Sequence, residues 1–207
     1  MRIVGVADTH LFHDDLTVPD GDVFIHAGDL CRGGDLAELA IAAAWIRSLP
    51  HRIKIVVAGN HDWAFVHHPQ RARALLGADI VYLEDSGITI DGVRFWGSPW
   101  QPRFFDWAFN LDRGAPLKAK WDLIPAGTSV LVTHGPPFGI LDMTARGEAV
   151  GCEELLAAVA RLKPRVHIFG HIHEAHGERR DEHTRYVNAA NCDLRYRAVQ
   201  PPIVVEL

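Results

Sequence analysis

Three histidines occur within the nine residues "FGHIHEAHG" (169–177), directly after an apolar run. If this segment is extended, His171 and His173 point to the same face, because side chains two residues apart on a strand lie on one side. Two imidazoles on one face can bind a transition metal. The chain has 13 histidines, so this pair alone leaves open whether it forms a metal site or a chance pairing.

Polar residues follow four other apolar runs in the same way. Because the carboxyl ends of parallel strands face one crevice, we expect all five run ends to converge on one site. Glycines beside these polar residues allow the backbone to approach an ion or a phosphate closely. The five runs and the residues after them are 2–7 with Asp8 and His10, 22–27 with Gly28 and Asp29, 52–58 with Gly59 to Asp62, 129–133 with His134 and Gly135, and 165–169 with Gly170 to His173.

Two helices are predicted between these runs. The first covers 35–48, with Asp35 as the N-cap and Glu38 in the first turn. The second covers 151–162, with acidic residues at its start, basic residues at its end and Pro164 just beyond. Short β-branched runs that alternate with helices favour an α/β fold with parallel pairing in part of a sheet.

Further strands are expected outside the five runs. Asp91-Gly92 predicts the turn of a hairpin over 86–97, because this dipeptide favours the tight turns that join antiparallel strands. The segments "RYVNAANC" (185–192) and "PIVVEL" (202–207) are expected to be strands that close a second sheet.

The composition is typical of one globular domain, which we expect to span 1–207, with 48% hydrophobic and 23% charged residues. No apolar run approaches the ~18 residues that span a bilayer, and no signal peptide is recognisable at the N-terminus, so we expect a cytoplasmic protein without membrane contact. Cys31, Cys152 and Cys192 lack C-x-x-C spacing and indicate neither a disulfide framework nor a thiolate zinc site. The formal net charge of −5 argues against a broad surface for nucleic acid.

In chain order, the motifs Asp-x-His, Gly-Asp, Gly-Asn-His-Asp, His and Gly-His-x-His resemble those of the calcineurin-like metallophosphoesterases. The match runs from Asp8 to His173. The stretches 97–110, 133–142 and 187–192 resemble the metallophosphoesterase-domain-containing subgroup of fetal-brain type. The resemblance implies a four-layer α/β/β/α sandwich, in which helices flank two mixed β-sheets, and a site with two metal ions.

The resemblance also implies which residues bind the two divalent ions. Asp29 is expected to bridge them, because a carboxylate has two oxygen atoms. Nitrogen and oxygen ligands without thiolate suit manganese, which we expect, or iron or zinc. The first ion is assigned to Asp8, His10, Asp29 and His173, and the second to Asp29, Asn60, His134 and His171.

In the mechanism that the resemblance implies, a hydroxide bridging the two ions attacks phosphorus in line. His61 is expected to protonate the leaving oxygen, and Asp62 to keep that imidazole charged and aimed. We therefore expect a phosphodiesterase whose partner is a small phosphoester, such as a 2′,3′-cyclic nucleotide or another nucleotide diester. The alternatives are a phosphomonoesterase of broad specificity and a scaffold that binds a nucleotide or a protein with low turnover. The sequence does not indicate an oligomeric state.

An aromatic-rich segment over 96–109 has two interpretations. Its rings either form the wall of a base-binding pocket by stacking or pack into the core. Arg103 in this segment can reach a phosphate, and His26 is either a core residue or a donor that supports a metal ligand. The aromatic residues are Trp96, Trp100, Phe104, Phe105, Trp107 and Phe109.

Overall fold

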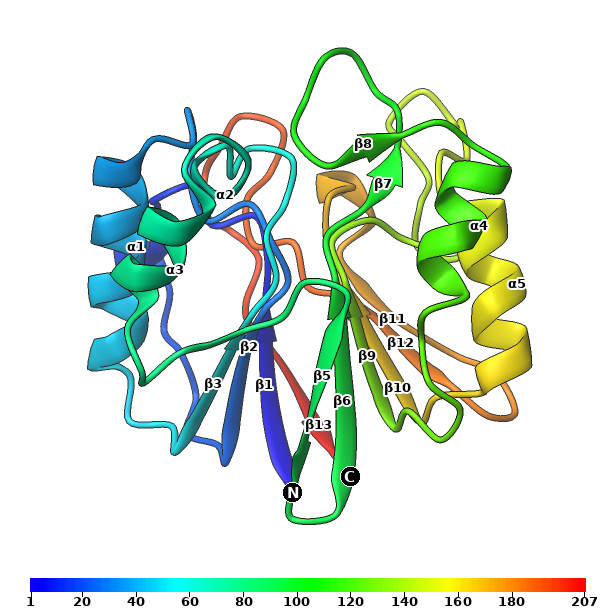
Figure 1. The fold of residues 1–207 in the computed structure, drawn as a ribbon, viewed down its shortest axis with the longest axis horizontal. Coiled ribbons are helices and arrows are strands. Elements are labelled where there is room, and N and C mark those ends of the chain that lie inside the picture. Colours follow the sequence, from blue (N-terminus) through cyan, green and yellow to red (C-terminus); the bar gives the residue numbers. More distant parts are fainter.

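The computed structural model describes residues 1–207, which form two β-sheets packed face to face with helices on both outer sides (Figure 1). This arrangement confirms the predicted α/β/β/α sandwich. The first sheet contains, in spatial order, β13 (Ile203–Glu206), β1 (Arg2–Val6), β2 (Val23–His26), β3 (Ile53–Val56) and β4 (Val81–Tyr82). Its strands are parallel except for β13, which pairs antiparallel with β1.

The second sheet has a parallel centre and two antiparallel edges. Its spatial order is β11 (Gly177–Arg180), β12 (Arg185–Asn188), β10 (Val166–Phe169), β9 (Val130–Thr133), β6 (Val93–Ser98) and β5 (Ser86–Ile90). A separate two-stranded ribbon pairs β7 (Gln101–Pro102), within the aromatic-rich segment, with β8 (Asn110–Leu111), which directly follows that segment.

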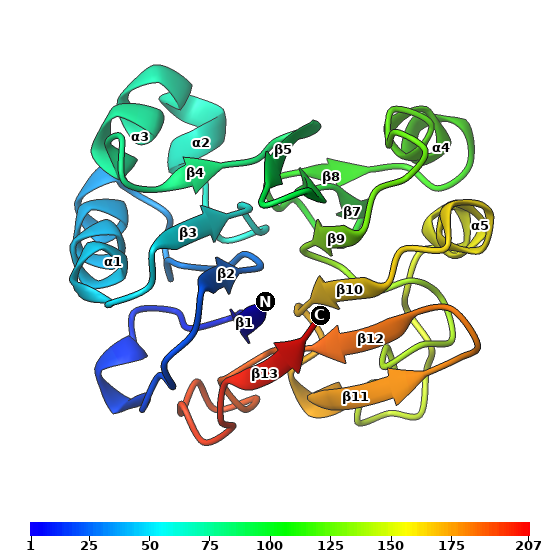
Figure 2. The ribbon, with the colours of Figure 1, turned by 90° about the horizontal axis from the view of Figure 1, so that it is seen from below.

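Five helices cover the outer faces of the sheets (Figure 2). On the first sheet lie α1 (Leu36–Ser48), α2 (Ala64–His67) and α3 (Pro69–Leu76), and on the second lie α4 (Ala115–Trp121) and α5 (Glu153–Leu162). Helices α1 and α5 confirm the two predicted helices, and the Asp35 side chain accepts the predicted N-cap bonds. Helices α2, α3 and α4 were not predicted, because four to eight residues are too few for a clear apolar period.

The central strands are mostly apolar because both faces of each sheet are covered. In β1, Ile3 is buried between the two sheets, whereas its neighbour Val4 packs with the helices of the first sheet. In β9, Val132 lies between the sheets and Leu131 packs with the helices of the second. Apolar residues along these strands thus alternate between the core shared by the sheets and an outer core under the helices, and the predicted ligand residues follow the strand ends.

The segment at the C-terminus corrects one prediction. Residues 185–188 join the second sheet as expected, but 203–206 pair with β1 in the first sheet. Strand periodicity cannot tell which of two sheets an edge strand joins, since either one offers an apolar face. The hairpin over 86–97 is confirmed, with both Asp91 and Gly92 at positive φ.

The three cysteines are buried as free thiols. None of the helices is both long enough and apolar enough to cross a membrane.

Candidate metal centre

The five polar strand ends meet at one edge of the molecule, although they come from two sheets. Three of these ends follow strands of the first sheet, β1, β2 and β3, and two follow strands of the second, β9 and β10. Six of the seven predicted ligand residues are buried and the seventh, His171, is half-buried. The facing sheets therefore bring together side chains that are up to 165 positions apart in the sequence.

Asp8, His10 and His173 form one group whose ligand atoms all lie within 4.8 Å of one another. His173 Nε2 is 3.4 Å from Asp8 Oδ1 and 3.3 Å from His10 Nε2. His10 Nε2 is also 3.8 Å from Asp29 Oδ2, so Asp29 adjoins this group.

Asp29, His134 and His171 form a second group, whose ligand atoms also lie within 4.8 Å of one another. His134 Nε2 lies 3.4 Å from Asp29 Oδ1 and 2.9 Å from the side-chain oxygen of Asn60. Asp29 thus presents Oδ2 to the first group and Oδ1 to the second. This is the placement that a bridging carboxylate requires.

Backbone carbonyls orient three of these imidazoles. A carbonyl oxygen only accepts hydrogen bonds, so each Nδ1 carries a proton and each Nε2 faces the site with its lone pair when the ring is neutral. Orientation of this kind is usual for histidines that bind metal ions. The bonds run from Nδ1 to the carbonyl oxygens of Cys31 for His10 (3.0 Å), Ala27 for His134 (3.0 Å) and Asp193 for His173 (3.1 Å).

The donor set fits divalent cations. Asp8 Oδ1 is buried and makes no hydrogen bond, with His173 Nε2 near it at 3.4 Å, whereas its other oxygen accepts the His171 N–H at 2.8 Å. A buried carboxylate oxygen without a donor is costly unless a cation satisfies it. The Nε2 atoms of His10 and His173 also approach each other closely beside this oxygen. If both imidazoles were neutral, their lone pairs would face each other, so this contact also requires a cation or a proton.

Without ions, protons compensate the buried carboxylates. Burial opposes protonation of His134 and His173, but Asp29 and Asp8 outweigh it and raise the pKa of each imidazole to about 9. Burial raises the pKa of Asp29, but His134 and His10 lower it well below its usual range. Bound cations would displace these protons, since metal ligands must be deprotonated.

The backbone at the site adopts conformations that side chains usually avoid. Asp8, His10, Asp29 and His171 have φ of 53°, 44°, 58° and 70°. Such residues cost about 1–3 kcal/mol each and persist where the surrounding structure imposes them, often at functional sites. A Cβ at Gly170 would lie 2.1 Å from Asp8 Oδ2, so the β10 end can approach Asp8 only as glycine.

His171 and His173 do not share one face of an extended strand, which corrects the expectation from their spacing. Strand β10 ends at Phe169, His171 is left-handed and His173 begins a 3-10 turn. Both imidazoles nevertheless reach the site, because the sharp turn after the strand redirects them.

The predicted contact between Asp62 and His61 is wrong. The Asp62 carboxylate is buried and accepts backbone N–H bonds from Asp29, Leu30, Cys31 and Gly59. Burial and the charge of Asp29 raise the pKa of Asp62 to about 6, while these donors lower it. Asp62 therefore anchors the backbone of the site.

His61 is oriented by other groups. Its Nδ1 lies 2.6 Å from the Arg32 carbonyl oxygen, and its Nε2 lies 4.0 Å from Asp29 Oδ2. The Trp107 ring packs on it with centroids 4.3 Å apart, and the His10 ring meets it edge-on. The imidazole is thus held beside the two ligand groups with Nε2 directed toward them.

A cavity of about 440 Å³ opens beside the ligand groups, a size typical of small-molecule sites. Phe104 and Trp107 line it, whereas Phe109 packs into the core and Phe105 is 77% exposed. The aromatic-rich segment therefore contributes rings both to the cavity wall and to the core. Arg103 also lines the cavity, but its guanidinium pairs with Asp112 at 2.6 Å.

Tyr196 is a site residue that the sequence analysis missed. Its ring packs edge-on against His10, His61 and His173 and lines the cavity. It lies between arginines in a stretch with no motif, so no sequence signal marks it. His26 is a core residue, since its Nε2 bonds Thr9 Oγ1 at 2.8 Å and burial lowers its pKa to about 3.

Comparisons with known proteins agree with this geometry. A family model described as calcineurin-like phosphoesterase matches residues 1–175. The chain is 44% identical over 231 residues to metallophosphoesterase domain-containing protein 1 of Homo sapiens, covering 100% of this chain and 71% of that protein. It is 40% identical over 217 residues to UPF0046 protein K07C11.7 of Caenorhabditis elegans, covering 99% and 74%. The crystal structure of TT1561 of Thermus thermophilus has the same fold, with a TM-score of 0.62 at 13% identity over 99% of this chain and 98% of that one.

Proposed function

Since this chain belongs to the calcineurin-like phosphoesterase family, a family of dinuclear metal-dependent hydrolases, we propose that it hydrolyses phosphodiesters, with nucleotide diesters such as 2′,3′-cyclic nucleotides as the substrate class. The observation that carries the proposal is that two structural features adjoin each other. Buried metal-ligand groups with an unpartnered carboxylate oxygen adjoin a small-molecule cavity with aromatic walls.

The two ions are assigned to the two groups described above. Asp8, His10 and His173 would hold the first, Asn60, His134 and His171 the second, and Asp29 would join both. When bound, the ions lower the pKa of a water molecule and offset the charge of the phosphoryl group. Manganese is the ion we propose, and the nitrogen and oxygen ligands are compatible with it as they are with iron or zinc.

His61 is assigned the role of general acid. Its Nε2 faces the ligand groups while its Nδ1–H is held by the Arg32 carbonyl, so a proton on Nε2 points toward the position of the substrate. Trp107 on one ring face and His10 at its edge restrict rotation of the imidazole. The proton passes from Nε2 to the departing ester oxygen as the P–O bond breaks.

The cavity favours a diester over a monoester. A diester keeps an organic group beyond phosphorus, which Phe104, Trp107 and Tyr196 can contact, and stacking of a base on an aromatic ring contributes about 1–3 kcal/mol. A monoester carries more negative charge, which free cationic side chains near the ions would help to offset. Arg103 and Arg113 line the cavity, but both are paired with carboxylates.

The proposal is tested by comparing kcat/KM for bis-nitrophenyl phosphate, nitrophenyl phosphate and 2′,3′-cyclic AMP in one manganese buffer. We expect both diesters to be hydrolysed faster than the monoester. A monoester preference above about tenfold, equivalent to 1.4 kcal/mol, would contradict the diesterase assignment and leave the metal site in place.

Replacing His171 by glycine should reduce the bound metal from two equivalents toward one. The variant removes only the imidazole, since glycine adopts a φ of 70° without strain and keeps the N–H that bonds Asp8. Elemental analysis after dialysis measures the stoichiometry. Two retained equivalents with unchanged activity would show that His171 is not a ligand.

A further inference from the structure

In the loop between strand β2 and helix α1, six consecutive N–H groups are bound by two carboxylates. Residues 29–34 supply six consecutive donors. Asp62 accepts the first three, from Asp29, Leu30 and Cys31, at 2.9, 3.3 and 3.0 Å. Glu38 accepts the other three through the single atom Oε2, from Arg32, Gly33 and Gly34, at 3.0, 2.8 and 2.9 Å.

The same loop orients two imidazoles of the site. The Cys31 carbonyl accepts from His10 Nδ1 in the half bound by Asp62, and the Arg32 carbonyl accepts from His61 Nδ1 in the half bound by Glu38. The two carboxylates thus divide the loop. Asp62 secures the part that supports a metal ligand, and Glu38 secures the part that supports the general acid.

Helix capping does not account for the position of the Glu38 carboxylate. At the third position of α1, a glutamate commonly reaches back to the N–H of the N-cap residue. Here the N-cap is Asp35, and Glu38 Oε2 instead binds three N–H groups that precede it. The carboxylate therefore acts on the loop before the helix.

The loop also packs directly on the backbone of the general acid. A Cβ at Gly34 would lie 2.0 Å from the His61 carbonyl oxygen and 2.5 Å from the Trp63 nitrogen. Displacement of this half of the loop would thus move His61 itself as well as its hydrogen-bond acceptor.

We propose that Glu38 is a positioning residue that holds His61 by fixing the Arg32 carbonyl. The assignment rests on the proposed function, in which His61 protonates the leaving group. The Glu38 carboxylate accepts its hydrogen bonds from the loop and none from His61, although both side chains line a small surface cavity. Its effect on the reaction is therefore assigned to the loop.

Glu38→Ala should lower kcat/KM about 10- to 100-fold for a diester with an alkyl leaving group, a loss typical of groups that orient a site residue. The loss should be smaller with nitrophenyl leaving groups, which need no proton, and the metal content should stay unchanged. Glu38→Gln keeps a carbonyl oxygen for the three donors and should recover most of the activity.

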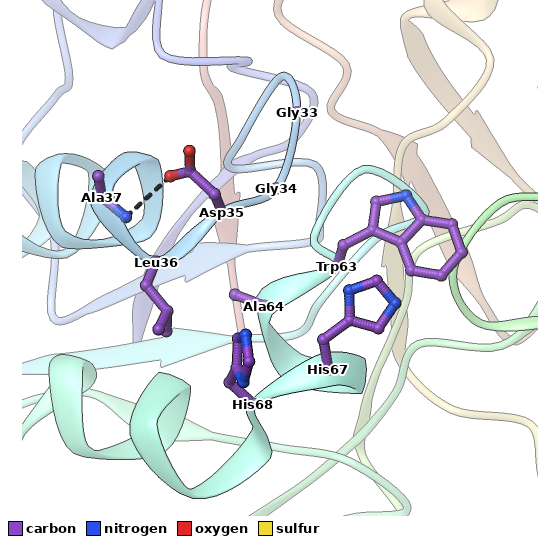
Figure 3. A pocket seen from close by; sticks show the side chains of 9 residues that line it. All are labelled: Gly33, Gly34, Asp35, Leu36, Ala37, Trp63, Ala64, His67 and His68. Atoms are coloured by element: carbon purple, nitrogen blue, oxygen red, sulfur yellow. Dashed lines mark hydrogen bonds between the residues drawn. The ribbon is translucent and has the colours of Figure 1, made fainter.

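Asp35→Ala is the matched control. Asp35 caps the same helix by accepting N–H bonds from Ala37 and Glu38 at 2.8 Å, beside a separate cavity that contains Trp63 and His67 (Figure 3). It accepts no N–H from Arg32 to Gly34, so its loss should destabilise α1 and leave catalysis nearly intact. An equal loss in Asp35→Ala would assign the effect to helix stability and overturn the proposal.

Two further measurements separate this proposal from the proposed function. In a His61→Ala background, Glu38→Ala should cause no additional loss, and an additional loss would contradict action through His61. At a pH at which the His61 ring is neutral, its ¹⁵N signals should show the remaining proton on Nδ1 in the unaltered chain and mixed tautomers in Glu38→Ala. An unchanged tautomer in the variant would overturn the positioning role, even if the chain hydrolysed no phosphoester and the proposed function failed.

Discussion

Replacing His61 by alanine is expected to lower kcat/KM for diesters with alkyl leaving groups by about 10²- to 10⁴-fold, the usual contribution of a general acid. The Nε2 atom of His61 faces Asp29 Oδ2 at 4.0 Å from outside the two assigned ligand groups. The alternative is that His61 is itself a ligand, because His10, Asp29 and His61 also lie close enough to hold an ion. Retention of two equivalents of metal in the variant supports the acid role, and loss of an ion supports ligation.

The leaving group provides the second measurement on this variant. Nitrophenolate departs without a proton, so the loss should be much smaller for bis-nitrophenyl phosphate than for an alkyl diester. Equal losses for both substrates would remove His61 from the acid role. His67→Ala is the matched control, since His67 stacks on Trp63 in the separate cavity of Figure 3 and should tolerate replacement.

Removal of metal should lower the melting temperature by about 10 °C. Ligand present at 1,000 times its dissociation constant stabilises a protein by about 4 kcal/mol, and 1 kcal/mol shifts the melting temperature of a chain of this size by about 2–4 °C. The bound ions would satisfy Asp8 Oδ1 and offset the charges of Asp8 and Asp29, which are both buried. Thermal unfolding with manganese and with excess chelator measures the difference.

Asp29→Asn is the control for this measurement. The amide oxygen can still accept the His61 N–H that Asp29 Oδ1 accepts at 2.8 Å, but the bridging charge is lost. The variant should therefore fold, yet gain little stability from added manganese. A full gain in the variant would show that manganese stabilises the chain at a different place.

The sequence pattern was sufficient to predict an α/β fold and the convergence of five strand ends, and the family resemblance added the four layers. Strands covered on both faces have mostly apolar sequences, so a cluster of polar residues directly after a strand, such as Asp8, Asp29 or His134, stands out as a candidate site. The N-cap at Asp35 and the turn at Asp91-Gly92 were equally predictable, because both depend on interactions within a few residues.

Contacts between distant segments were decided only by the tertiary structure. Strand 203–206 joins the first sheet because it pairs with the edge of β1. The apolar periodicity of 203–206 cannot indicate this partner. Tyr196 reaches three imidazoles of the site from a stretch without a motif. Asp62 was expected to aim His61, but its position under the 29–31 backbone makes it an acceptor of N–H groups, and Glu38 secures the Arg32 carbonyl that orients His61. A motif identifies which side chains can do chemistry, whereas the packing of loops from separate strands determines which partner each of them meets.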